Sequence, residues 1–140
     1  MTTSERKGHC LCGAVRFIAR GEPKWVAHCH CGSCRRATSA GFATYAGYLA
    51  DAVEWTGVAL SAYRSSPGVI RRFCPRCGSP MSFEGERWAG EIHLFVPSFE
   101  DPAAFTPRGH VFVEEQMPWV HLADGLPRYA KTAREGPPLA

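Results

Sequence analysis

Seven cysteines carry most of the chemistry available to this 140-residue sequence. Each lies two or three positions from another cysteine, in three clusters: Cys10-x-Cys12, Cys29-x-Cys31-x-x-Cys34 and Cys74-x-x-Cys77. In a reducing cytosol, cysteines spaced this closely bind metal or perform redox chemistry more often than they form structural disulfides. An odd number of them also cannot pair completely. Zinc, which prefers four soft ligands in a tetrahedron, is the metal that this pattern favours.

Two of the clusters together predict one closed zinc site. Cys74-Pro75-Arg76-Cys77-Gly78 has the form of a zinc knuckle, in which the glycine is free to adopt a positive φ after the second ligand. Cys10 and Cys12 supply two further thiolates from a segment 62 positions away. Four thiolates complete a tetrahedral site, and closed sites of this kind are structural.

The third cluster, Cys29, Cys31 and Cys34, has three thiolates and no fourth cysteine. Catalytic zinc sites keep one position for water or substrate, so we expect an open three-cysteine zinc here. The alternative is a second structural zinc completed by His28 or His30. Because side chains alternate along an extended strand, we expect Cys29 and Cys31 on one face and both histidines on the other.

Redox chemistry is the other interpretation of the two C-x-x-C pairs, which have thioredoxin-like spacing. A redox pair of this type opens a helix in a βαβ unit. Gly78, Ser79 and Pro80 would break a helix after the second pair, and Gly41 would end a short one after the first. Redox chemistry also leaves Cys10 and Cys12 unexplained, so we prefer the zinc interpretation.

Short strands joined by turns are expected to position these clusters. The 14 glycines and 11 prolines disfavour long helices. Alternating apolar residues and turn signals predict eight strands. They cover residues 14–19, 25–28, 41–45, 60–64, 69–73, 81–84, 91–96 and 110–113. Helix is expected only as one or two turns after Ser33 and near residues 101–105, with Asp101 as the cap and Pro102 at the first position.

The chain is thus expected to be an all-β protein with one domain over residues 1–140. We expect an ordered core over about residues 6–131, with frayed termini. The net charge of +3 is too small to argue for a nucleic-acid or membrane surface. The sequence has no apolar run of about 18 residues and no secretory signal at its start, so we expect a cytoplasmic protein without nucleic-acid or membrane partners. The oligomeric state is not indicated.

The cysteine spacings and their surroundings resemble those of the glutathione-dependent formaldehyde-activating (GFA) family, which also includes centromere protein V. The resemblance runs through GHCLCGAVRF, AHCHCGSCRRATSAGF, VEWTG, YRSSPGVIRRFCPRCGSPMSF and HVFVEEQMPWVHLADGLPRY. It implies a GFA-like domain with the β-tent fold, made of short antiparallel sheets with two knuckle-type zinc sites. By this resemblance Cys10, Cys12, Cys74 and Cys77 match the structural site, and Cys29, Cys31 and Cys34 match the catalytic one.

The family's activity implies a carbon–sulfur lyase of the S-(hydroxymethyl)glutathione synthase type. Its substrates would be a small thiol, glutathione or similar, and formaldehyde or another small aldehyde. Three thiolates outweigh the two positive charges of a zinc ion, which favours activation of the thiol over polarisation of the carbonyl. Ser33 is expected to cap the helix that carries Cys34. Arg35 and Arg36 are expected to offset the thiolate charge or to bind a substrate carboxylate, a solvated basic turn being the alternative.

Three further side chains have two interpretations each. Trp119 could line a substrate pocket or pack in the β core. His93 and His110 could act as general acid or base, against the commoner role of a hydrogen-bonded or exposed histidine. For the whole protein, the alternative to an enzyme is a non-catalytic zinc-binding interaction module. Such modules usually show a basic stripe or an apolar patch, which the scattered basic residues do not form in the sequence.

Overall fold

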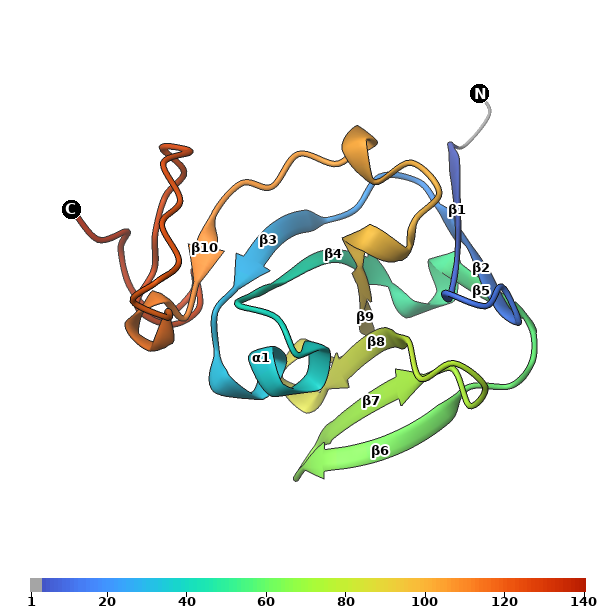
Figure 1. Cartoon of the computed structure of the whole chain (residues 1–140). Coiled ribbons are helices and arrows are strands. Elements are labelled where there is room, and N and C mark those ends of the chain that lie inside the picture. The colour runs from blue at the N-terminus through green and yellow to red at the C-terminus, as the bar shows by residue number, and fades with distance from the viewer. Residues whose placement is uncertain (1–3) are drawn as a thin grey trace. The chain divides into compact units, whose positions relative to one another are not determined.

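The structure, a computed structural model, describes residues 4–140. This part of the chain contains ten strands and one α-helix (Figure 1). The strands are β1 (Glu5–His9), β2 (Val15–Arg20), β3 (Trp25–Cys29), β4 (Ala43–Leu49), β5 (Val53–Gly57), β6 (Ser61–Ser66), β7 (Val69–Phe73), β8 (Pro80–Gly85), β9 (Glu91–Phe95) and β10 (His110–Val111). The helix is α1 (Gly32–Thr38). Single 3-10 turns are η1 (Ala50–Ala52), η2 (Glu86–Trp88), η3 (Val96–Ser98), η4 (Pro102–Ala104) and η5 (Val113–Glu115). The expected all-β class, with little helix, is confirmed.

The described chain divides into two compact units. The first contains residues 4–24 and 46–105, and the second contains residues 25–45 and 106–140. By these bounds β4 begins in the second unit and ends in the first. The expectation of one domain over residues 1–140 stays a prediction.

In the first unit, β1, β2 and β5 form a three-stranded antiparallel sheet. Strand β2 follows the expected alternation, because Val15, Phe17 and Ala19 are buried. The Phe17 ring meets the Phe99 ring edge to face at 4.9 Å. A Cβ atom at Gly8 of β1 would overlap the Phe17 ring, so this close approach requires glycine.

The other sheet segment of the first unit contains β6 to β9 as neighbouring antiparallel strands. Met81 of β8 and Leu94 of β9 are fully buried. All five residues of β9, part of the strand predicted over residues 91–96, are buried. Its buried carboxylate, Glu91, accepts hydrogen bonds from Lys24 Nζ at 3.0 Å and lies 3.2 Å from His93 Nε2. These partners satisfy the buried charge.

In the second unit the strands lie in the order β10, β3 and β4. Along the chain, helix α1 connects β3 to β4. Strand β10 runs parallel to β3, with His110 opposite His28. This parallel pair departs from the antiparallel expectation. It is possible because a long connection, rather than a hairpin, leads to β10.

The N-terminal segment differs most from expectation. Strand β1 begins at Glu5, close to the expected start of the ordered core at about residue 6, but no strand was predicted there. Both β1 and β5 were missed because most of their side chains are not buried, so apolar alternation is weak. At the other predicted helix, η4 has Pro102 in its first turn, but Asp101 makes no side-chain cap hydrogen bond. Within residues 4–140 no helix is long and apolar enough to cross a bilayer.

Candidate functional site

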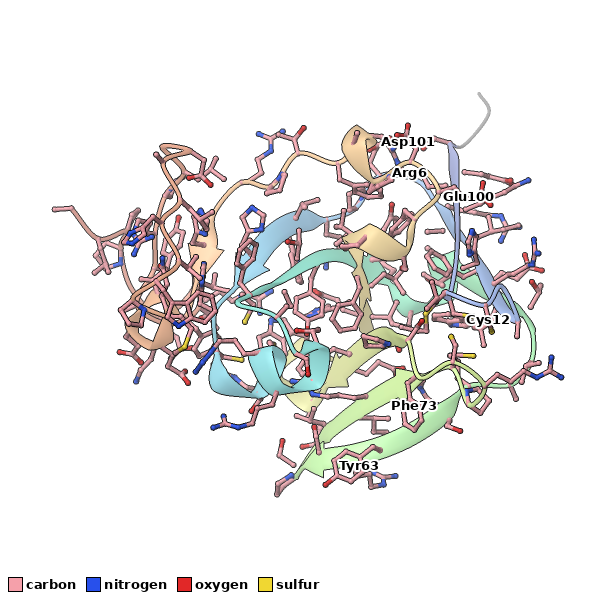
Figure 2. The ribbon with its side chains drawn as sticks, in the orientation of Figure 1. Arg6, Cys12, Tyr63, Phe73, Glu100 and Asp101 are labelled. Atoms are coloured by element: carbon pink, nitrogen blue, oxygen red, sulfur yellow. The ribbon has the colours of Figure 1, made fainter. Side chains whose placement is uncertain are left out.

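The first unit brings the sulfurs of Cys10, Cys12, Cys74 and Cys77 together, all within 4.8 Å of one another. Cys12 lies in the turn after β1, and Figure 2 shows sulfur atoms beside it. The Cys10 and Cys12 sulfurs are 3.6 Å apart, and those of Cys12 and Cys74 are 3.9 Å apart. Sulfurs that bind one tetrahedral zinc at 2.3 Å are about 3.8 Å apart. The donor set therefore fits a four-cysteine zinc.

Backbone amides are directed at these sulfurs, as in a zinc knuckle. Val15 N donates to Cys10 Sγ at 3.3 Å, and Arg76 N donates to Cys74 Sγ at 3.4 Å. Gly13 and Gly78 adopt φ values of +80° and +76°, which turn the chain back after each pair. Hydrogen bonds from N–H groups favour the charged thiolate that a metal requires.

Ser79 connects the two halves of this site and was missed in the sequence. Its Oγ accepts a hydrogen bond from Leu11 N at 3.0 Å and lies 3.1 Å from Cys77 Sγ. Hydrogen bonds from the Ser79 hydroxyl and backbone lower the pKa of Cys77 to about 5. The only sequence signal was its position directly after the knuckle glycine.

The second unit brings together the sulfurs of Cys29, Cys31 and Cys34, also within 4.8 Å. Cys29 is the last residue of β3, and Cys34 lies in the first turn of α1. The expected cap, Ser33, is wrong: Cys31 is the N-cap, and its Sγ accepts a hydrogen bond from Cys34 N at 3.3 Å. Ser33 is exposed and already inside the helix.

The environment of these three sulfurs favours a bound cation. Tyr45 Oη of β4 donates to Cys34 Sγ at 3.2 Å, a contact that the sequence did not reveal. The neighbouring Cys31 and Cys34 thiols, together with burial, raise the pKa of Cys29. Three adjacent thiolates are unstable without a compensating positive charge. The cluster therefore fits a metal that neutralises it, and zinc suits an all-sulfur donor set.

The two arginines after the cluster have contacts of their own. Arg35 Nη1 lies 3.5 Å from Met117 Sδ, and Arg36 Nη1 donates to Gly32 O at 3.4 Å. Glu115, missed in the sequence, accepts a hydrogen bond from Gly32 N at 3.1 Å and fixes the start of α1. Arg36 is exposed, so its charge remains accessible to a ligand.

Trp119 is 67% exposed, so its interpretation as a core residue is wrong. Its ring lies against Gly41, where a Cβ atom would come within 3.3 Å of it. An exposed indole held over a glycine is available for contact with a ligand.

The histidines near the three-cysteine cluster have other partners. His28 Nδ1 lies 2.8 Å from Thr44 Oγ1, and His30 Nε2 lies 2.9 Å from His110 Nδ1. Among the residues that the structure describes, the ligand group around these sulfurs contains only the three cysteines. His93 belongs to the first unit, where it contacts Glu91 and stacks on Phe83.

A hollow of about 480 Å³ lies elsewhere in the first unit, between β5 and the segment that follows it. Trp55 and Leu60 contribute to its lining, and the ion pair of Arg72 with Glu84, at 2.9 Å, lies at its side. No cysteine lines it. We therefore base the functional argument on the cysteine clusters.

Comparison with known proteins identifies the family of this chain. The profile of the family described as glutathione-dependent formaldehyde-activating enzyme matches residues 5–115. No curated protein matches the chain. A crystal structure of a Rhodobacter sphaeroides protein is similar in fold, with 20% sequence identity over 88% of this chain and 98% of that chain, and a TM-score of 0.55. Because the family profile spans most of the chain and all seven cysteines, the chain belongs to the glutathione-dependent formaldehyde-activating enzyme family.

Proposed function

We propose that this chain is a zinc-dependent carbon–sulfur lyase of the S-(hydroxymethyl)glutathione synthase type. It would bind two zinc ions, one at the four-cysteine cluster and one at the three-cysteine cluster. The observation that carries the proposal is the difference between the two ligand sets, four sulfurs in one and three in the other. A set of three protein ligands leaves a position for substrate.

The reaction joins a thiol to formaldehyde or another small aldehyde. The thiol sulfur attacks the carbonyl carbon, a C–S bond forms, and the π electrons of the C=O bond move to oxygen. The proton lost by the thiol ends on that oxygen, so the product is an S-hydroxymethyl thioether and no redox partner is needed. A zinc ion at the three-cysteine cluster would supply the Lewis acidity that lowers the pKa of the incoming thiol.

The chain's own residues hold the cluster and moderate its negative charge. Tyr45 Oη and Cys34 N each donate a hydrogen bond to a cluster sulfur, so the electron density on those ligands is reduced. Glu115 holds the backbone of Gly32 and thereby fixes the segment between Cys31 and Cys34. These contacts keep the local geometry constant while substrate enters and leaves.

We assign substrate contacts to Arg35, Arg36 and Trp119. Arg36 and Trp119 are exposed, and Arg35 is half-buried. A guanidinium group binds a carboxylate through two parallel hydrogen bonds, and glutathione carries two carboxylates. The thiols required for zinc binding suit a reducing compartment such as the cytosol.

The test is a measurement of exchange at equilibrium, because thiols add to formaldehyde without a catalyst. Magnetisation transfer between hydrated formaldehyde and its thiol adduct gives the exchange rate with and without zinc-loaded protein, for glutathione and a panel of other thiols. We expect acceleration by the wild type and none by Cys34→Ser. Ala37→Ser, which adds a serine to the same helix without removing a sulfur ligand, is the matched control.

A wild-type protein that binds two zinc ions and accelerates exchange for no thiol would overturn the proposal. The non-catalytic zinc-binding interaction module would then be the better interpretation. Equal acceleration by wild type and Cys34→Ser would also contradict it, because the three-cysteine cluster would have no part in the reaction.

A further inference from the structure

We propose that His28, His110 and Asp124 form a third metal site, which binds a divalent transition ion such as zinc through two nitrogens and one oxygen. One ligand atom from each of the three side chains lies within 4.8 Å of the other two. The site contains none of the seven cysteines, and it is separate from the proposed lyase function.

Strand register brings the two histidines together. His110 of β10 lies directly opposite His28 of β3 in a parallel pair. Their side chains consequently leave the sheet on the same face. Their ring centroids are 4.9 Å apart with an interplanar angle of 30°, close enough for both rings to reach one ion with their edges.

The remaining ring nitrogens are already held by neighbours. Thr44 Oγ1 lies 2.8 Å from His28 Nδ1, and His30 Nε2 lies 2.9 Å from His110 Nδ1. Both contacts leave Nε2 as the nitrogen for a metal. Histidine ligands almost always donate their other N–H to such a partner, which fixes the tautomer and the ring orientation.

Asp124 supplies the carboxylate. Its Oδ2 lies 2.8 Å from His110 Nε2, and its Oδ1 accepts a hydrogen bond from Leu126 N at 3.1 Å. The Leu126 amide and the hydrogen bond with His110 lower the pKa of Asp124, so the group stays ionised. The His110 residue is only 1% exposed, whereas the Asp124 side chain is 36% exposed. An ion can therefore enter from solvent past Asp124 and reach the buried His110.

Two imidazoles and one carboxylate form a donor set typical of zinc and of non-haem iron. Donor atoms around one tetrahedral zinc are about 3.3 to 3.5 Å apart. The observed separations, from 2.8 Å up to the 4.8 Å limit, lie on both sides of this value, so shifts within the side chains would complete the site. Three protein ligands leave a further position for water or a small ligand.

The experiment uses the full chain loaded with two equivalents of zinc, which fill the two cysteine sites and leave the third site free. Co²⁺ is then added while heat and visible absorption are measured. We expect one further Co²⁺ per chain, with d–d bands of nitrogen and oxygen ligation and without the sulfur-to-cobalt charge-transfer band of a cysteine site. Asp124→Asn should weaken this binding more than about 100-fold, since it replaces a charged carboxylate ligand by a neutral amide rather than changing an outer partner.

Two further variants sharpen the assignment. Thr44→Val keeps the shape of the side chain but removes the outer partner of His28, and should weaken Co²⁺ binding about 10- to 100-fold. His121→Gln removes an exposed histidine outside the cluster and serves as the matched control, with affinity unchanged. Asp124 is partly exposed, so Asp124→Asn changes the site at its rim and leaves the buried His110 side chain in place.

The proposal is overturned if the protein loaded with two equivalents of zinc takes up no Co²⁺. It is equally overturned if Asp124→Asn and Thr44→Val bind Co²⁺ as tightly as the wild type. None of these measurements uses thiol–aldehyde exchange, so failure of the lyase proposal and failure of this site would be distinguished.

Discussion

Ser79→Ala tests whether a residue that contacts a cysteine ligand, but does not itself bind the metal, strengthens zinc binding at the four-cysteine cluster. Ser79 makes two contacts, one with the Leu11 amide and one with the Cys77 sulfur. Leu11 is 86% exposed, so water can replace the hydroxyl at its amide. The lost contact with sulfur therefore determines the effect. Loss of one outer partner of a metal ligand costs about 10- to 100-fold in metal affinity, and we expect a decrease of this size.

The pH dependence of the same variant has a defined sign. Ser79 lowers the pKa of Cys77 to about 5, so in the wild type protons compete with zinc for this sulfur only as the pH falls towards that value. Without the hydroxyl the pKa of Cys77 rises, and competition begins at a higher pH. The difference in affinity between variant and wild type should therefore widen between about pH 8 and about pH 6.

The assay is competition for zinc against a chromophoric chelator, at both pH values. Ser66→Ala, at an exposed serine at the end of β6, is the matched control and should bind zinc as the wild type does. A Ser79→Ala protein with wild-type zinc affinity at both pH values would refute the reasoning, because Ser79 would then have no influence on the metal ligand.

Four further predictions concern the remaining parts of the sites. Metal analysis should find close to two cysteine-bound zinc ions per purified chain, and Cys34→Ser should contain one fewer. Cys74→Ser should unfold the protein, since a structural zinc supplies about 10 to 16 kcal/mol of folding free energy. Cys34→Ser should lose only the metal of the three-cysteine cluster and still melt cooperatively. Calorimetry distinguishes the two variants, and normal melting of Cys74→Ser would contradict the assignment of the four-cysteine site. Tyr45→Phe removes a hydrogen bond to a charged sulfur and should slow thiol–aldehyde exchange about 10-fold or more, with an unchanged rate counting against the role of Tyr45. Gly41→Ala should shift Val120 and Trp119 slightly, because the added Cβ would lie 3.0 Å from a Val120 methyl carbon and 3.3 Å from the indole ring. Fluorescence of the indole reports the change, and an unchanged spectrum together with an unchanged KM would argue against this contact.

The partition of the cysteines could be predicted from the sequence because ligand number and spacing are local properties. The four-cysteine and three-cysteine groups gather in space as their spacing indicated. Strand positions were predictable where one face is buried, as in β2. Strands β1 and β5 could not be predicted in this way, since few of their residues are buried and the apolar signal is weak.

The residues that support the sites could not be predicted, because their roles depend on the tertiary fold. Tyr45 and Glu115 reach the three-cysteine cluster from β4 and η5, and no spacing rule connects them to it. Thr44 lies beside His28 because β4 neighbours β3 in the sheet, and Asp124 contacts His110 from the chain that follows β10. The cap at Cys31 was missed since a serine two positions later has the stronger preference for that role.

The different spans of the two cysteine clusters have a consequence for the order of events during synthesis. Cys29, Cys31 and Cys34 occupy one six-residue segment, whereas the other cluster needs Cys12 and Cys74, which are 62 positions apart. At about 5 to 20 residues per second, the ribosome makes Cys77 about 2 to 9 s after Cys34. The shorter segment is therefore complete as a chelator while the longer-range site still lacks half of its ligands. Metal supply to the nascent chain would reach the three-cysteine segment first, and the closed site would fill only after residue 77 has emerged.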